Sequence, residues 1–326
     1  MPMRIKPCLK LCTHYQMNLL GKKVGIDTNC PELPLVFLDS NCITSCDGNL
    51  SEDYKITALL SMAINSNFTS DDIVISESDD GDDIFMNEVY LTGGNQTTFI
   101  TYPNNTIIHE TADCSSTYII TGNKDVLVYY LKKAIKKIAS EIFVQSGYIA
   151  IHAGAIVSGH KCYILLGDSY AGKSTLCYNL YTQGYQYIND DIVFLKKEST
   201  QWIVKSLMIY PNLRECAFDY LSNKEIPCES IHSEYQKSFS IRSIQFSSED
   251  VFVEKMFYIG SIQSGTSYIL DPIKSVEIIS RAVIEHGKIQ HIQLIHNAII
   301  ELAHDIECVR CCNSDAYDYL IKQLKN

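Results

Sequence analysis

The sequence predicts an α/β (α+β) fold in two parts: a small β-rich region over residues 1–120 and a larger domain with a mixed sheet over residues 121–326. Three observations lead to it. Short apolar runs separated by turn residues fill the first part, which is typical of β-strands. An amphipathic helical pattern opens the second part, and strands and helices then alternate around a glycine-rich loop. A chain of 326 residues fits two such units, because a domain takes about 100–200 residues.

Five apolar runs in the N-terminal region predict strands. Turn sequences at 79–81 (Asp-Asp-Gly) and 93–95 (Gly-Gly-Asn) separate some of them. The runs are Leu35–Leu38, Ile73–Ile75, Val89–Leu91, Phe99–Tyr102 and Tyr118–Ile120. This region carries no motif to which chemistry can be assigned, so its role is left open.

Residues 125–145 predict an amphipathic helix, because apolar residues recur there at helical spacing. Lys132, Lys133, Lys136 and Lys137 lie between them and indicate the solvated face of that helix. An apolar run at 148–157, a turn at 158–161 and a second run at 162–166 then predict two strands joined as a hairpin.

The rest of the chain predicts alternating elements. We expect a helix at 175–183 and a strand at 187–195 with Asp190 and Asp191 at a kink in its middle. Apolar runs follow at 202–204, 208–211, 256–259 and 267–270. Asp271-Pro272 predicts a helix start, because Asp caps helices and Pro suits the first helical position. A helix at 288–304, a strand at 307–312 and a helix from about 314 complete the chain.

The formal net charge of −11 argues against a nucleic-acid interface, which needs clustered lysine and arginine. No apolar stretch reaches the length of a signal-peptide core at the N-terminus or of a transmembrane helix elsewhere. We therefore expect a cytoplasmic protein without a membrane span and without a nucleic-acid partner.

Thirteen cysteines and nine histidines raise the question of a metal or redox site. Only Cys308 and Cys311 form a C-x-x-C pair, with Cys312 directly after it, and no second pair lies at a zinc-site distance. Buried, reduced thiols are the simpler interpretation, although a redox or metal role for Cys308–Cys312 stays open. The C-terminal histidines lack the i, i+4 spacing of a helical metal pair, so we expect surface or packing roles for them. They are His286, His291, His296 and His304.

Residues 167–174, Gly-Asp-Ser-Tyr-Ala-Gly-Lys-Ser, match the P-loop (Walker A) pattern G-x-x-x-x-G-K-[ST] between a predicted strand and a predicted helix. Glycines let backbone N–H groups wrap phosphates, and the helix directs its positive end at them. Lys173 is expected to neutralise the β- and γ-phosphates of ATP or GTP, and Ser174 to place its hydroxyl on Mg²⁺. The alternative is a turn that merely joins a strand to a helix. The predicted nucleotide-binding residues are Gly167, Asp168, Ser169, Tyr170, Ala171, Gly172, Lys173, Ser174 and Thr175.

Phosphoryl transfer also requires a carboxylate for the metal and a base for the attacking hydroxyl. Adjacent side chains on a strand face opposite ways, so the two aspartates need not share a role. We assign Asp190 to the metal and Asp191 to the base. An acidic pair at a turn or strand end is the alternative. His152 lies in an apolar run, where a histidine is commonly a core residue, but its place before the loop makes it a further catalytic candidate beside Lys173.

Three blocks together resemble the catalytic domain of HPr kinase/phosphorylase and its HPr-kinase-like relatives. They are Ile151–Ala155 with its histidine, Leu166–Leu176 with the loop, and Gly184–Asp191 with the Asp-Asp pair. Weaker similarity at Tyr210–Arg214 and Ile306–Arg310 extends the resemblance over about residues 145–326. It implies a mixed-sheet fold related to phosphoenolpyruvate carboxykinase. The functional positions of the family match His152, Lys173, Ser174, Asp190 and Asp191.

The resemblance implies a kinase, since the family phosphorylates a serine hydroxyl of a small protein. The chain lacks the Glu- and Arg-Gly-containing signature that follows Asp-Asp in true HPr kinases, and its N-terminal region differs from theirs. Relatives without that signature include kinases that tailor ribosomally made peptides such as lasso-peptide precursors. We therefore expect Mg²⁺-dependent transfer of the γ-phosphate of ATP to a Ser or Thr hydroxyl of a peptide or small protein. A homo-oligomer stays open, because relatives assemble.

Other functions also stay open. One is a regulatory module or an ATPase that binds nucleotide without transferring phosphate, and another is a true HPr serine kinase. An ABC-type ATPase fits less well, because the chain has neither a Leu-Ser-Gly-Gly-type signature nor an apolar strand ending in Asp-Glu.

Overall fold

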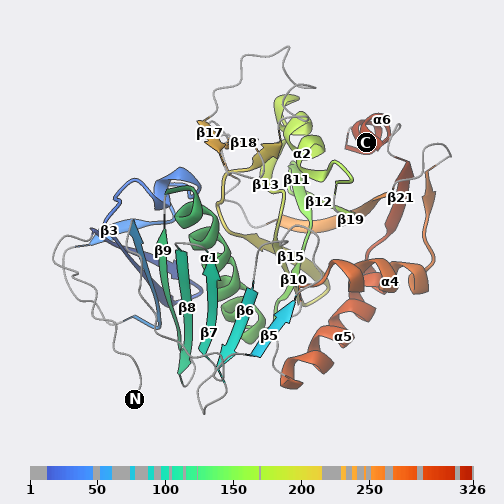
Figure 1. Ribbon diagram of the computed structural model, residues 1–326. Coiled ribbons are helices and arrows are strands. Elements are labelled where there is room, and N and C mark those ends of the chain that lie inside the picture. Colours follow the sequence, from blue (N-terminus) through green and yellow to red (C-terminus); the bar gives the residue numbers. More distant parts are fainter. Residues whose placement is uncertain are drawn as a thin grey trace. The chain divides into compact units, whose positions relative to one another are not determined.

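The computed structural model describes residues 13–46, 52–60, 74–77, 87–91, 97–102, 105–112, 115–122, 124–168, 170–214, 229–232, 237–240, 246, 251–260, 267–284, 289–312 and 316–324. The chain divides into two compact units, Met1–Ile138 and Ala139–Asn326, and Figure 1 shows the elements of both. The division falls inside helix α1 (Lys124–Gln145), whereas the boundary drawn from the sequence, at residue 120, lies ahead of that helix.

The first unit contains a mixed nine-stranded sheet in the order β3-β1-β2-β4-β9-β8-β7-β6-β5. Most neighbours are antiparallel, while β4 runs parallel to both β2 and β9. Four of the predicted apolar runs are confirmed as strands, in β5, β6, β7 and β9. The strands are β1 Thr13–Leu19, β2 Lys22–Thr28, β3 Thr44–Cys46, β4 Tyr54–Leu60, β5 Val74–Glu77, β6 Asn87–Leu91, β7 Thr97–Tyr102, β8 Asn105–Ala112 and β9 Ser115–Gly122.

The run Leu35–Leu38 is not a strand, so this prediction is wrong. A 3₁₀ helix, η2 (Pro34–Val36), occupies the position, and Pro34 stands in its first turn. Proline fixes φ near the helical value and cannot donate to a ladder, which favours a helical turn over a strand. The apolar character that suggested a strand reflects burial, since Phe37 and Leu38 are both in the core. The predicted turns at 79–81 and 93–95 lie outside the described residues.

The second unit is built on another mixed sheet, whose main path runs β10-β14-β15-β19-β12-β11-β13, with β21 beside β19 and β20 beside β21. A three-stranded antiparallel sheet, β16-β18-β17, is separate. The strands are β10 Ile149–Ile151, β11 Gly154–Ser158, β12 Lys161–Gly167, β13 Gln186–Asn189, β14 Val193–Glu198, β15 Gln201–Ser206, β16 Asn212–Arg214, β17 Glu229–His232, β18 Lys237–Ser240, β19 Val251–Gly260, β20 Tyr268–Ile269 and β21 Cys308–Cys312.

Helices of the second unit follow the sequence predictions closely. α2 (Lys173–Thr182), α5 (Ile289–Asp305) and α6 (Ala316–Leu324) confirm the helices expected from 175, 288 and 314 to within two residues. α4 (Pro272–Ala282) begins at the predicted cap, where the Asp271 side chain accepts a hydrogen bond of 2.9 Å from the Lys274 backbone N–H. Within the described ranges, no helix combines the length and the apolarity needed to cross a membrane.

Three parallel strands bring their carboxyl ends to one edge of the sheet. β12 runs parallel to β19, and β19 runs parallel to β21. β12 arrives there from the predicted hairpin with β11, which is confirmed by the pairing of Ser158 with Lys161. The glycine-rich loop follows β12, so it lies at the edge where open α/β sheets commonly hold ligands.

Two predicted long strands are each broken in two: the break in 148–157 corrects the expectation, and the kink expected at Asp190 and Asp191 is a full break. The run 148–157 forms β10 and β11, with His152 and Ala153 between them, and the run 187–195 forms β13 and β14, with 190–192 between them. β10 pairs with β14, whereas β11 pairs with β13 near the other end of the sheet. Because Ile151 and Gly154 are only three residues apart, their Cα atoms can be at most about 11 Å apart, so the sheet must curl until these strand ends approach each other.

Helix α2 packs closely on β11. Gly154 allows this approach, because a Cβ at that position would lie 2.5 Å from Sγ of Cys177 on α2, while its next neighbour would be 3.5 Å away. Cys177 belongs to a buried cluster drawn from the sheet, α2 and α6. Representative members are Ile156, Leu165, Leu180, Tyr187, Phe257 and Leu320.

The Gly154–Cys177 contact predicts a destabilising variant and its rescue. Gly154→Ala should lower the free energy of unfolding by about 1–3 kcal/mol, because the added methyl overpacks a closed core. Cys177→Ala in the same background should recover most of that loss, since it removes the one atom that clashes. Urea unfolding of both single variants and the double variant measures the coupling. Additive losses would contradict the close contact.

Candidate functional site

The loop between β12 and α2 has a backbone that its glycines make possible. Gly172 adopts φ 87° directly before the helix, and Tyr170 also has a positive φ of 66°. A Cβ at Gly167 would lie 2.8 Å from the Ile259 carbonyl oxygen, too close for any other residue. The glycine-rich pattern thus reflects one left-handed turn and one close approach of two strands.

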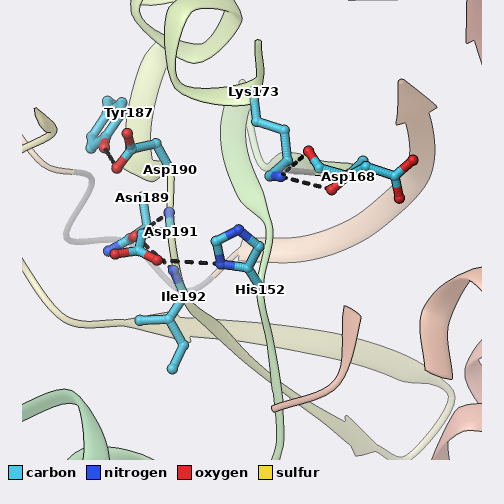
Figure 2. Close-up of polar contacts among 9 residues, drawn as sticks. His152, Asp168, Lys173, Tyr187, Asn189, Asp190, Asp191 and Ile192 are labelled. Atoms are coloured by element: carbon cyan, nitrogen blue, oxygen red, sulfur yellow. Dashed lines mark hydrogen bonds and ion pairs between the residues drawn. The ribbon is translucent and has the colours of Figure 1, made fainter. Parts of the chain in front are cut away.

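Lys173 is the first residue of α2 and is buried, with 6% of its surface exposed. Its Nζ donates hydrogen bonds to the carbonyl oxygens of Gly167 at 2.7 Å and Asp168 at 3.1 Å, as Figure 2 shows. Burial lowers the pKa of this ammonium group, while the nearby Asp168 and Asp190 act in the opposite direction. The loop therefore holds a buried lysine against its own carbonyls.

The other predicted loop residues differ in exposure. Asp168 and Tyr170 are open to solvent, with Tyr170 at 70% exposure, while Gly167 is half-buried. Ser174 and Thr175 are half-buried in the first turn of α2, where backbone N–H groups lack intrahelical partners. Ala171 is half-buried and Gly172 exposed. Ser169 lies outside the described residues.

Asp190 is a buried carboxylate in the break after β13, with 7% of its surface exposed. The Tyr187 hydroxyl donates to its Oδ1 at 2.8 Å. Burial raises the pKa of Tyr187 well above its usual value, and the neighbouring Asp190 adds to that effect, so the hydroxyl keeps its proton for this bond. On α2, burial lowers the pKa of Lys173 and raises the pKa of Cys177, and the charge of Asp190 opposes the first shift and adds to the second.

Asp191 and His152 form a pair at the two strand breaks. The His152 Nδ1 lies 3.3 Å from Asp191 Oδ1, and the side chains are 45% and 31% exposed. The sequence suggested that His152 lies within a strand, but it lies between two strands. Its backbone N–H donates to the Ala282 carbonyl at 2.7 Å instead of to a neighbouring strand. The imidazole is therefore accessible rather than part of the core. Figure 2 shows this pair apart from the Tyr187–Asp190 contact.

Asn189 holds the Asp-Asp segment in place and was missed in the sequence. It is 1% exposed; its Oδ1 accepts from the backbone N–H groups of Asp191 at 2.9 Å and Ile192 at 3.0 Å, and its Nδ2 donates to the Leu207 carbonyl at 2.8 Å. The only sequence signal was an Asn directly before the carboxylates, since Asn commonly bonds to backbone two residues on.

A backbone hydrogen bond joins the two breaks. The Ala153 N–H donates to the Asp191 carbonyl at 3.2 Å, and the Cys177 Sγ lies 3.8 Å from the Asn189 carbonyl. The structure thus brings together His152, Lys173, Asp190 and Asp191, which come from three separate stretches: the break between β10 and β11, the start of α2, and the break between β13 and β14.

The cysteines and histidines form no metal-holding cluster among the described residues. This part of the chain contains no group of three or more His, Cys, Asp or Glu side chains arranged to hold a metal ion. Cys308 and Cys311 are buried free thiols on β21, and burial raises the pKa of Cys308 to about 12. His296 and His304 are exposed on α5, while His286 lies outside the described residues.

Comparison with known proteins adds a structural likeness. No protein-family model matches the chain, and no curated protein matches it. Among solved structures, it is similar to the HPr(Ser) kinase/phosphatase from Coxiella burnetii, with 13% sequence identity, a TM-score of 0.27, and coverage of 53% of this chain and 97% of that chain. A likeness at this TM-score supports no conclusion about activity.

Asn189→Ala should destabilise the second unit and disorder the Asp-Asp segment. The change leaves two backbone N–H groups and one carbonyl without their buried partner, at a cost of about 3 kcal/mol in unfolding free energy. Urea unfolding measures it. Gln186→Ala, an exposed change on the same strand, is the matched control and should cost little. An equal effect of the two changes would show that Asn189 has no special supporting role.

Proposed function

We propose that this protein is a Mg²⁺-dependent kinase that transfers the γ-phosphate of ATP or GTP to a Ser or Thr hydroxyl of a peptide or small protein. The observation that carries the proposal is the convergence of a buried lysine at a glycine-rich loop with two carboxylates of different exposure. Lys173 and Asp190 are buried, while Asp191 is accessible beside His152.

The nucleotide phosphates would bind over the loop and the first turn of α2. Backbone N–H groups there lack intrahelical partners and, with the helix dipole, favour an anion. Lys173 would turn its Nζ from the loop carbonyls toward the β- and γ-phosphates. A phosphate oxygen is the stronger partner, because it carries a negative charge that attracts the ammonium group, whereas a carbonyl oxygen is neutral.

Ser174 and Asp190 have the chemistry to hold Mg²⁺, which prefers oxygen ligands and takes only one or two carboxylates beside the substrate phosphates. Within the described part of the chain, Tyr187 is the one hydrogen-bond donor to the buried Asp190 carboxylate. A buried anion with one donor needs a further positive partner. When bound, the ion would supply positive charge that offsets the negative charge of the phosphates.

Asp191 would accept the proton of the attacking hydroxyl. The acceptor oxygen forms a bond to the γ-phosphorus, the bond from that phosphorus to the β–γ bridging oxygen breaks, and the nucleoside diphosphate leaves. The proton passes to Asp191 Oδ, which His152 orients through its contact at 3.3 Å. Exposure of this pair matches an acceptor that arrives from solvent.

The kinase proposal is tested with γ-labelled ATP or GTP, Mg²⁺ and a panel of Ser- and Thr-containing peptides and small proteins. Wild type should label an acceptor. Lys173→Ala and Asp191→Asn should each lower the transfer rate at least about 100-fold, the range expected for loss of charge stabilisation or a general base.

The same assay separates the alternatives. Binding of nucleotide without label on any acceptor would favour a regulatory module, and release of inorganic phosphate alone would favour an ATPase. Labelling restricted to the small protein HPr would indicate a true HPr kinase. Full transfer by Asp191→Asn together with loss in Asp190→Asn would overturn the assignment of the base. The control is Lys197→Ala. The Lys197 ammonium group lies 2.7 Å from the Asp305 carboxylate and is not part of the loop.

Tyr187→Phe tests whether Asp190 is a metal ligand, because it removes the hydroxyl that donates a hydrogen bond to the Asp190 carboxylate. Loss of a hydrogen bond that orients a ligand commonly weakens metal affinity about 10-fold to 100-fold. We expect at least about tenfold more Mg²⁺ to be needed for half-maximal nucleotide binding, with binding restored at saturating Mg²⁺. Titration with a fluorescent nucleotide analogue measures this shift. An unchanged Mg²⁺ requirement would count against Asp190 as a ligand.

A further inference from the structure

Arg310 carries a positive charge that forms no ion pair with any other described residue. Its Nε is buried and has no hydrogen-bond partner, and in the part of the chain that the structure describes its guanidinium makes no ion pair. The contact that it does make is with the Tyr258 ring, whose centroid lies 5.8 Å from the guanidinium carbon. A buried donor without a partner is costly, which indicates that something else completes this site.

Strand register places Arg310 on the same edge as the loop. Leu166 pairs with Tyr258, and Tyr258 pairs with Arg310, so the three residues form one row across β12, β19 and β21. Neighbouring strands are about 4.8 Å apart, which puts the backbone of Arg310 about 10 Å from the residue before the loop. Paired residues of parallel strands direct their side chains to the same face.

Tyr258 connects Arg310 to the loop. Its hydroxyl donates to Asp168 Oδ2 at 3.1 Å, and burial, followed by this hydrogen bond, raises the pKa of Tyr258, so the hydroxyl stays protonated. The ring therefore stands between the loop carboxylate and the guanidinium. Gly260 lies against both, because a Cβ there would be 3.4 Å from the Tyr258 ring and 3.5 Å from Nε and Nη2 of Arg310.

An oxyanion suits this position better than a carboxylate of the protein. Asp168 is an acidic side chain in contact with the row, yet it accepts from Tyr258 and not from Arg310. The planar fork of an arginine matches two oxygens of a phosphate, and stacking on an aromatic ring fixes its plane. Lys173 and the helix N-terminus serve the phosphates from the loop side, while Arg310 stands on the third strand of the same edge.

We propose that Arg310 contacts the terminal phosphate of the nucleotide held by the Gly167–Ser174 loop, with Tyr258 as the positioning residue that fixes the guanidinium. This proposal rests on the proposed function, since it requires a nucleoside triphosphate at that loop. It adds a cation from β21 to the two predicted sources of positive charge at the loop.

The test compares the affinities of a non-hydrolysable ATP analogue and of ADP, each with Mg²⁺, by equilibrium titration of the full chain. Arg310→Gln should weaken binding of the triphosphate analogue about 10-fold to 100-fold, the range of a lost charge-assisted hydrogen bond. ADP binding should stay within about twofold, because ADP lacks the terminal phosphate. Arg310→Lys should lose less than Arg310→Gln, and Tyr258→Phe should give a smaller loss of the same selectivity.

Controls separate this proposal from the proposed function. Arg281→Gln removes a neighbouring arginine that has its own partner, Glu277, and should leave both affinities unchanged. If wild type binds neither nucleotide, the proposed function fails. If wild type binds both and Arg310→Gln weakens neither, or weakens both equally while thermal unfolding shows a folded protein, the role of Arg310 in reading the terminal phosphate is overturned.

Discussion

The site depends on two strand breaks that are joined to each other. The Ala153 N–H bonds to the Asp191 carbonyl, and the Asn189 side chain holds the backbone of residues 191 and 192. Residues in each break make no strand-to-strand hydrogen bonds, so their backbone N–H and C=O groups need other hydrogen-bond partners. The partners come from the other break, from Asn189 and from Ala282. This requirement fixes the backbone that carries His152, Asp190 and Asp191.

The breaks also distribute charge between buried and accessible positions. Asp190 lies inward beneath the Tyr187 hydroxyl, whereas Asp191 lies outward beside His152. Lys173 is buried as well, with two loop carbonyls as its partners. Burying ions is costly unless they are paired and hydrogen-bonded. The fold therefore holds a cation and an anion in a region where a charged ligand would complete the pairing, and that is the physical basis of the proposed transfer.

The parallel strands β12, β19 and β21 supply the second constraint. Because they run the same way, the loop, Tyr258 and Arg310 meet at one edge even though the sequence separates Gly167 from Arg310 by more than a hundred residues. Close contact at this edge is possible because Gly167 lacks a Cβ where the Ile259 carbonyl approaches. A substrate that bound here would meet groups from three strands and one helix N-terminus.

The sequence by itself determined the helices, the β11–β12 hairpin and the position of the loop between a strand and a helix, because these depend on local periodicity, caps and glycine geometry. Asp271 at the start of α4 is one such local signal. The kink expected at Asp190 and Asp191 was also a local signal, but tertiary structure alone decided that the run 148–157 breaks and that the halves of both runs pair with different strands of a curled sheet. It also decided that Leu35–Leu38 is not a strand, that Asn189 supports the carboxylates, and that Arg310 lies in a row with the residue before the loop. Strand order and register bring such residues together, and no local pattern records either.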